Sequence, residues 1–169
     1  MAVLRIRTIG DPVLREESRK IENIGDEIIR LAESMIETMR VYRGIGLAAP
    51  QVGESVSLVV VPSREDWEEA ESVAIVNPVL SRLKGSIMGE EGCLSVPGFS
   101  ENVKRSEHCV LTGQDLDGNE MRIEAQDFLA RVFQHEVDHL KGVLYVDRLS
   151  PLKRQFVLKR IQRELKDRE

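Results

Sequence analysis

Two histidines four residues apart, with a glutamate beside the first, form the pattern with the clearest chemistry in this sequence. The segment from His135 to His139 reads HEVDH, an H-E-x-x-H pattern, within a stretch predicted to be helical. Residues four apart on a helix lie on the same side, so both imidazoles can bind a single metal ion. Glu136 can then take a proton from a water molecule at that ion. The alternative is an amphipathic helix with two incidental histidines, although the chain has only three histidines in all.

A catalytic metal usually has a third protein ligand and one open position. No histidine follows His139, and Glu164 and Asp147 are weaker candidates, one on a basic tail and one beside a predicted strand. Cys93 is the better candidate, because the glycine before it in EEGCLSVP lets the backbone approach the site closely. A buried structural thiol is the alternative for Cys93. The second cysteine, Cys109, alternates with apolar residues in a predicted strand, and we assign it to the core.

A third segment combines glycines with a side-chain amide. Residues 44–53 read GIGLAAPQVG, and two glycines two positions apart permit a ligand to approach the backbone. The segment lacks the spacing and the lysine of a phosphate-binding loop, so a nucleotide site is not expected. Gln51 can donate and accept hydrogen bonds there, whereas a solvated loop residue is the simpler interpretation of that glutamine taken alone.

Taken in order, GIGLAAPQVG, EEGCLSVP and QHEVDHLKG resemble the three signature motifs of the peptide deformylase family. The resemblance covers nearly the whole chain, including the early segment Gly10–Leu14 and the turn at Asp115–Gly118. It implies that Cys93, His135 and His139 bind one ion, with water in the fourth position. The implied ion is Fe²⁺, which Zn²⁺ or Ni²⁺ can replace, and a ligand set of this kind suits both iron and zinc.

The resemblance also implies a reaction, the hydrolytic removal of the formyl group from the N-terminal formylmethionine of newly synthesised polypeptides, with release of formate. A metal-bound water attacks the formyl carbonyl, and Glu136 is the general base. The side-chain amide of Gln51 and the backbone N–H of Leu94 stabilise the oxyanion.

The substrate is expected to bind as an extended peptide along Gly44, Ile45 and Gly46, like an added strand. We place the methionine pocket at Ile45, Phe128, Leu129 and Val132. Hydrogen-bond acceptors and donors that orient the metal-binding histidines are also expected, and the candidates are Glu91, Asp138 and Arg105.

The elements that must position these residues follow from hydrophobic spacing. Apolar residues three and four apart predict helices over 24–42 and 126–141, and Ser150-Pro151 begins a third over about 150–167. Apolar and β-branched runs predict strands over 55–61, 73–76, 79–83, 103–112, 121–123 and 143–146, with a hairpin turn at Asp117-Gly118. Strands joined by turns favour an α+β fold of mostly antiparallel sheets around the central HExxH-bearing helix, with an N-terminal and a C-terminal helix. We expect residues 1–169 to form a single deformylase-like catalytic domain.

The composition describes a globular protein rather than a collagen-like or disordered one, with 41% hydrophobic and 31% charged residues among 169. No apolar run approaches the ~18 residues of a membrane span, and the first residues lack a signal-peptide pattern. We therefore expect a cytoplasmic protein with no membrane partner and no specific DNA site. The alternative is an organelle protein already trimmed of its transit peptide, which would show the same pattern.

The charge is unevenly distributed. Residues 150–169 hold seven basic and three acidic residues, a net +4, so that the remaining residues carry −9. We expect the C-terminal helix to dock through a stripe of Leu152, Phe156, Ile161 and Leu165. Its basic residues have two interpretations, a solvated helix face or a contact with the phosphate-rich ribosome.

Two rival functions share part of this pattern. A zinc endopeptidase uses the HExxH motif but draws its third ligand from downstream of His139, where no histidine follows. A metal-stabilised binding module without turnover uses the basic tail but leaves Glu136 and Gln51 without a role, and structural zinc sites prefer four protein ligands. Metal content and formate release distinguish the three functions.

Overall fold

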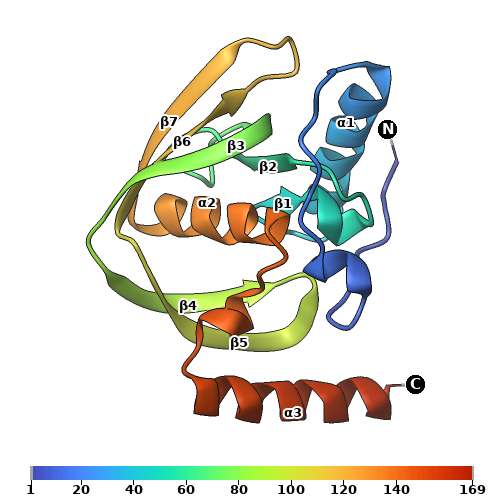
Figure 1. Ribbon diagram of the computed structural model, residues 1–169, viewed down its shortest axis with the longest axis vertical. Coiled ribbons are helices and arrows are strands. Elements are labelled where there is room, and N and C mark those ends of the chain that lie inside the picture. The colour runs from blue at the N-terminus through green and yellow to red at the C-terminus, as the bar shows by residue number, and fades with distance from the viewer. Residues whose placement is uncertain (1, 169) are drawn as a thin grey trace.

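The structure, a computed structural model, describes residues 2–168 and places a central helix between two antiparallel sheets (Figure 1). Its helices are α1 (Asp26–Val41), α2 (Asp127–Leu140) and α3 (Pro151–Asp167). Its strands are β1 (Leu47–Ala48), β2 (Leu58–Pro62), β3 (Ser72–Lys84), β4 (Ile87–Cys93), β5 (Val96–Arg105), β6 (His108–Gln114) and β7 (Glu120–Gln126). Short 3-10 helices are η1 (Pro12–Arg15), η2 (Ala49–Val52) and η3 (Tyr145–Arg148).

The larger sheet has the strand order β1-β2-β3-β6-β7, and β4 and β5 form a separate two-stranded ribbon. Every paired strand runs antiparallel to its neighbour. Figure 1 shows α2 between the larger sheet and the ribbon, and α1 on the other side of the larger sheet. The expected α+β fold, with mostly antiparallel sheets around the HExxH helix, is confirmed.

Strand β2 is apolar throughout because helices cover both faces of its sheet, and all five of its residues are buried. Side chains alternate between the faces of a strand. Val59 and Val61 join the apolar cluster that contains one side of α2, whereas Leu58 and Val60 join the cluster that contains α1. One β-branched run therefore fixes both helices on the sheet.

Helix α2 is buried from Leu129 to Leu140 without interruption. Phe133 and Val137 pack in the cluster with the larger sheet. The opposite side of the helix carries polar residues, among them His135 and His139, and faces the ribbon. Because buried polar groups need hydrogen-bond partners, this side of α2 has to be matched by polar residues on other elements.

Several predicted elements are confirmed and several strands are corrected. The strands expected over 73–76 and 79–83 form one strand, β3, with a register shift between Val76 and Val79. The three helices appear within a few residues of their expected bounds, as does the β6–β7 hairpin. Segment 103–112 is not one strand, because Gln134 of α2 bonds both backbone groups of Ser106, and the chain leaves the ribbon for the larger sheet there. Segment 143–146 is not a strand, because Asp147 accepts the Leu144 N–H and closes the turn of η3.

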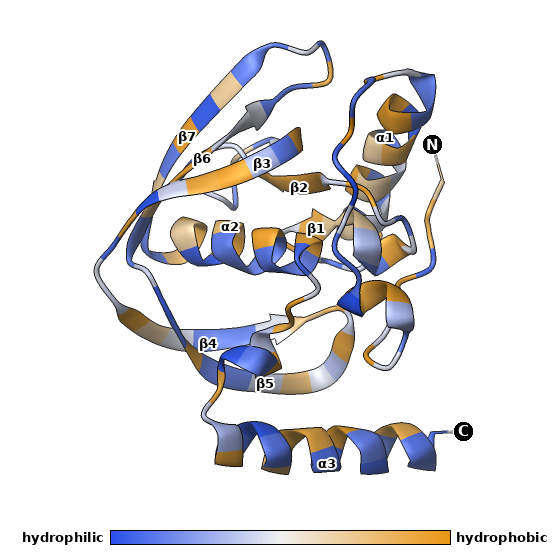
Figure 2. Cartoon of the chain, viewed as in Figure 1, coloured by the Kyte–Doolittle hydropathy of each residue, from blue (hydrophilic) through white to orange (hydrophobic). Residues whose placement is uncertain are grey.

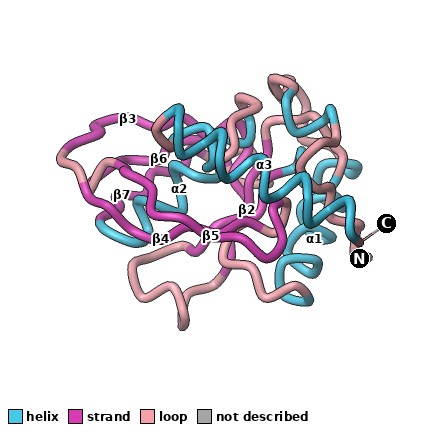
Figure 3. Tube along the Cα trace, turned by 90° about the horizontal axis from the view of Figure 1, so that it is seen from below, coloured by secondary structure: helices cyan, strands magenta, loops and turns pink. Residues whose placement is uncertain are grey.

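The expected docking stripe of α3 is also corrected. Val157 and Ile161 are the buried residues of the helix, with Leu158 and Leu165 partly buried in the same cluster. Leu152 and Phe156 are 80% and 64% exposed. At about 100° per residue, Leu152 lies on the opposite side of the helix from Ile161. Figure 2 shows hydrophobic and hydrophilic residues alternating along α3, and in Figure 3 this helix is the element nearest the viewer.

Within residues 2–168, none of the helices combines the length and the hydropathy that crossing a bilayer requires.

Candidate metal centre

Three potential ligands meet between α2 and the end of β4. The Nε2 atoms of His135 and His139 lie 3.2 Å apart, and Cys93 Sγ lies 3.4 Å from His139 Nε2. All three ligand atoms lie within 4.8 Å of one another. Ligands about 2.0–2.3 Å from a shared tetrahedral ion are themselves roughly 3.3–3.8 Å apart, so the two short separations fit one bound ion.

The electrostatics of this group also suit a cation. Burial lowers the pKa of His135, but the Cys93 thiol and the Glu91 carboxylate more than offset it and hold the pKa well above its usual value. Burial and the charge of His135 hold the pKa of His139 well below its usual value. His135 therefore favours its protonated form and His139 its neutral form, so the two facing Nε2 atoms do not both carry a proton.

Glu136 lies beside the ligands with a free carboxylate oxygen. Its Oε1 is 3.9 Å from His135 Nε2, and its buried Oε2 has no hydrogen-bond partner among the described residues. Gly46 makes room for it, since a Cβ at that position would lie 2.9 Å from Glu136 Cγ. Burial raises the pKa of Glu136 to about 7. A carboxylate in this position is able to accept a proton from water at the site.

Glu91 orients His135 through a buried ionic network. Its Oε1 accepts a hydrogen bond from His135 Nδ1 at 2.8 Å, and Arg105 binds both carboxylate oxygens at 2.8 and 2.9 Å. Burial raises the pKa of Glu91, but Arg105 and His135 outweigh it and hold the pKa well below its usual value. Arg105 also donates to Asp138 at 2.6 Å, and Arg148 donates to the same carboxylate at 2.7 Å. The three candidate orienting residues thus belong to one network.

Gln51 and Leu94 lie next to Cys93. The Oε1 of Gln51 accepts the Ala48 N–H at 2.9 Å, and its Nε2 donates to Cys93 Sγ at 3.4 Å and to Ser95 Oγ at 3.2 Å. The amide is therefore fixed with its NH₂ group toward the ligands, and only 2% of the residue is exposed. Leu94 follows Cys93 in the turn between β4 and β5. Together with Gln51 and Cys93 it lines a cleft over this group.

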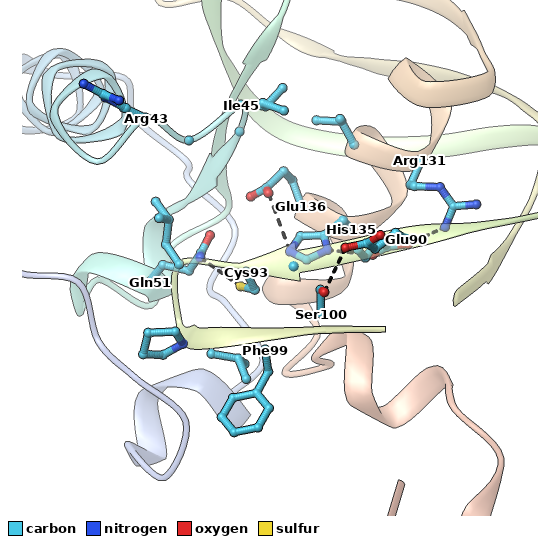
Figure 4. Close-up of a pocket in the computed structure, with 18 of the residues that line it drawn as sticks. Arg43, Ile45, Gln51, Glu90, Cys93, Phe99, Ser100, Arg131, His135 and Glu136 are labelled. Atoms are coloured by element: carbon cyan, nitrogen blue, oxygen red, sulfur yellow. Dashed lines mark hydrogen bonds and ion pairs between the residues drawn. The ribbon is translucent and has the colours of Figure 1, made fainter. Parts of the chain in front are cut away.

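A cleft of about 690 Å³ opens over this group (Figure 4). Five of the residues expected to contact substrate line it, namely Gly44, Ile45, Gly46, Phe128 and Val132. Leu129 does not, since it is 1% exposed and packs in the cluster with the larger sheet. The apolar residues of α2 that line the cleft are Phe128 and Val132, so the structure does not place Leu129 at the surface of the expected methionine pocket.

Sequence reasoning missed two residues near this cleft. Arg131 lines it, and its Nη1 donates to Glu91 Oε2 at 2.7 Å. An arginine one turn before a candidate metal ligand, His135, was the available signal. Trp67, between β2 and β3 in the sequence, has its ring centroid 5.2 Å from that of Phe128, and only the folded chain brings these two rings together.

Comparisons with known proteins agree with this geometry. The profile of the family described as Polypeptide deformylase matches residues 3–155. The peptide deformylase of Thermodesulfovibrio yellowstonii is 43% identical over 162 residues, which cover 96% of this chain and 98% of that protein. The peptide deformylase of Syntrophobacter fumaroxidans is 44% identical over 167 residues, covering 99% of this chain and 98% of that protein.

Solved structures agree as well. A crystal structure of peptide deformylase from Ehrlichia chaffeensis in complex with actinonin matches with a TM-score of 0.89 at 36% identity, covering 97% of this chain and 98% of that one. The structure of the Thermus thermophilus peptide deformylase gives a TM-score of 0.88 at 43% identity, with 96% and 95% covered. The chain therefore belongs to the peptide deformylase family of metal-dependent hydrolases.

Proposed function

We propose that this protein removes the formyl group from N-terminal formylmethionine of newly synthesised polypeptides and releases formate. The observation that carries the proposal is the convergence of Cys93, His135 and His139 with Glu136 in one cleft. We propose Fe²⁺ as the natural ion, replaceable by Zn²⁺ or Ni²⁺. A bound cation supplies Lewis-acid activation of water and of the formyl carbonyl.

The chain's own residues divide the remaining work. Glu136 takes the proton of the attacking water and delivers it to the leaving amine, a role that its unpartnered Oε2 supports. The Nε2 group of Gln51 and the N–H of Leu94 donate to the developing oxyanion. Loss of one such donor typically raises a barrier by about 2.7–4 kcal/mol.

The substrate adds along Gly44–Gly46 as an extended peptide. This segment leads into β1, which lies at an edge of the larger sheet. Pairing through the backbone accepts many sequences after the first residue, as a general processing enzyme requires. The methionine side chain fits the part of the cleft between Ile45, Phe128 and Val132.

The outer face of α3 is proposed to contact the ribosome, where formylated chains emerge, so the protein would act in the cytoplasm. Lys159, Arg163 and Lys166 are exposed on this helix, beside the exposed Leu152 and Phe156. The family profile ends at residue 155, so most of this helix lies beyond the part that defines the family. Residues 1–169 would function together as a single catalytic domain.

The test is anaerobic purification followed by metal quantification and a deformylation assay on the same sample. We expect one ion per chain and release of formate from a formyl-Met peptide. Cleavage of internal peptide bonds without formate release would favour the zinc endopeptidase. Bound metal with neither product would favour a binding module, and either result would refute the proposal.

A further inference from the structure

The proposed metal site is divided between two elements, so the spacing of those elements matters. His135 and His139 lie on α2, whereas Glu91 and Cys93 lie on β4. Among residues 2–168, strand β4 pairs only with β5, and an isolated two-stranded ribbon is marginally stable in water. Contacts from other elements therefore have to hold the ribbon in place, and they comprise an apolar cluster with η3 and α3 on one face and side chains of α2 on the other.

Arg131 spans the gap between these elements. It lies on α2, one turn before His135, and 7% of its side chain is exposed. Its Nη1 donates to Glu91 Oε2 and to the Val103 carbonyl, both at 2.7 Å, and its Nη2 donates to the Ile87 carbonyl at 3.0 Å. One guanidinium thus binds both strands of the ribbon and the carboxylate that orients His135.

Gly89 on β4 provides the space for this guanidinium. A Cβ at position 89 would lie 2.9 Å from Arg131 Nη2 and 3.0 Å from both Cζ and Nε. Gly89 does not have a positive φ, so its backbone conformation is open to other residues. A Cβ at this position would therefore displace the Arg131 guanidinium, so the space that Arg131 occupies, and not the conformation of the chain, favours glycine here.

We propose that Arg131, with Gly89 opposite it, is a positioning residue that fixes β4 against α2 and so sets the distance from Cys93 to the two histidines. Arg105 binds Glu91 from within the ribbon and reaches Asp138 on α2, so the two arginines hold the helix at separate points. The inference rests on the proposed metal site and deepens it.

The test measures metal affinity without reference to activity. Zn²⁺ is titrated into each variant in competition with a chelator of known affinity. Loss of a group that orients metal ligands typically weakens binding about 10–100-fold, and we expect this range for Arg131→Met. Gly89→Ala should weaken binding too, because it displaces the guanidinium. In the Arg131→Met background, Gly89→Ala should have no further effect, since the two changes act on one contact.

Gln134→Met is the matched control. Gln134 is also buried on α2, and it makes three hydrogen bonds, to the N–H and carbonyl of Ser106 and to the Ala130 carbonyl. These bonds do not involve Glu91 or the metal ligands. We expect Gln134→Met to lower thermal stability about as much as Arg131→Met while leaving Zn²⁺ affinity unchanged.

Equal Zn²⁺ affinity in the wild type and in Arg131→Met would overturn the inference, as would an equal loss in Gln134→Met. If Arg131→Met does not fold, Gly89→Ala decides the question, and its binding of Zn²⁺ with wild-type affinity would overturn the inference. Failure of the wild-type protein itself to bind Zn²⁺ would refute the proposed metal site, a result distinct from either of these.

Discussion

Glu136 is the residue on which the proposed chemistry most depends, because it is buried beside the ligands with one carboxylate oxygen unpaired among the described residues. Glu136→Gln keeps the volume of the side chain and removes its ability to accept the proton. We expect metal content near that of the wild type and deformylation reduced at least ~10²-fold, the usual scale of general-base catalysis. Near-normal turnover with metal bound would contradict the role given to this residue.

The two cysteines allow a matched comparison of thiols. Cys93 lies 3.4 Å from His139 Nε2 at the edge of the cleft, whereas Cys109 is fully buried in the apolar cluster. Burial raises the pKa of Cys109 to about 11, and this thiol does not belong to the group of candidate ligands among the described residues. We expect Cys93→Ser to lose bound metal and Cys109→Ser to retain it, as measured by metal analysis after dialysis. Loss of metal from Cys109→Ser alone would exclude Cys93 as the ligand.

At the scale of elements, η3 connects segments that are distant in sequence. Asp147 accepts hydrogen bonds from the Leu144 N–H at 2.9 Å, from Arg154 on α3 at 3.1 Å, and from Arg15 in η1. Burial raises the pKa of Asp147, but the bonds from Arg15 and Leu144 outweigh it and lower the pKa below its usual value of 3.8. The ionised carboxylate therefore stabilises the junction between both ends of the chain.

Asp147→Asn should lower the free energy of unfolding by about 1 kcal/mol at pH 7, since the arginine partners are partly exposed. A carboxylate with a lowered folded-state pKa adds stability above its unfolded pKa and loses it as the pH falls through the folded pKa. The difference from the wild type should therefore shrink below about pH 4, as measured by urea unfolding at pH 7 and pH 3. Asp66→Asn, at an exposed ion pair with Arg64, is the control and should change the free energy of unfolding little. If the difference between Asp147→Asn and the wild type is as large at pH 3 as at pH 7, the role given to Asp147 is contradicted.

Hydrophobic spacing predicted those elements that pack with one side against a single partner. Helix α2 shows a clear period because one side packs on the sheet, and its HExxH residues fall on the other side. Strand β4 escaped prediction because its sequence, IMGEEGC, has little β-branched character. Its conformation depends on pairing with β5 and on Arg131, two partners that lie far away in the sequence. The candidate ligand set was accessible through motifs, whereas the contacts that bring these residues together arise only from the tertiary fold.

At the scale of the whole molecule, the charges are separated between the body and one helix. The C-terminal segment carries +4 and the remainder −9. Lys153 pairs with Glu101 and Arg154 with Asp147, so these two help to fasten α3 to the body. Lys159 and Arg163 are exposed and form no salt bridge within residues 2–168. The helix therefore docks through its first turn and its apolar side and presents unpaired cations outward.

Charge reversal tests the proposed ribosome contact better than truncation, because removing the end of α3 would also remove Ile161 and Leu165 from their apolar cluster. We expect Lys159→Glu/Arg163→Glu to leave kcat/KM for a short formyl-Met peptide unchanged, since the cleft is formed by other elements. Ribosome co-sedimentation should fall, and the dependence of log affinity on log salt should become shallower by about one per lost phosphate contact. Lys20→Glu/Lys84→Glu, at two exposed lysines of the body, makes the same change in net charge and should keep most of the binding. If both double variants lose ribosome binding equally, net charge alone governs the association, and if neither loses it, α3 serves only to pack against the body.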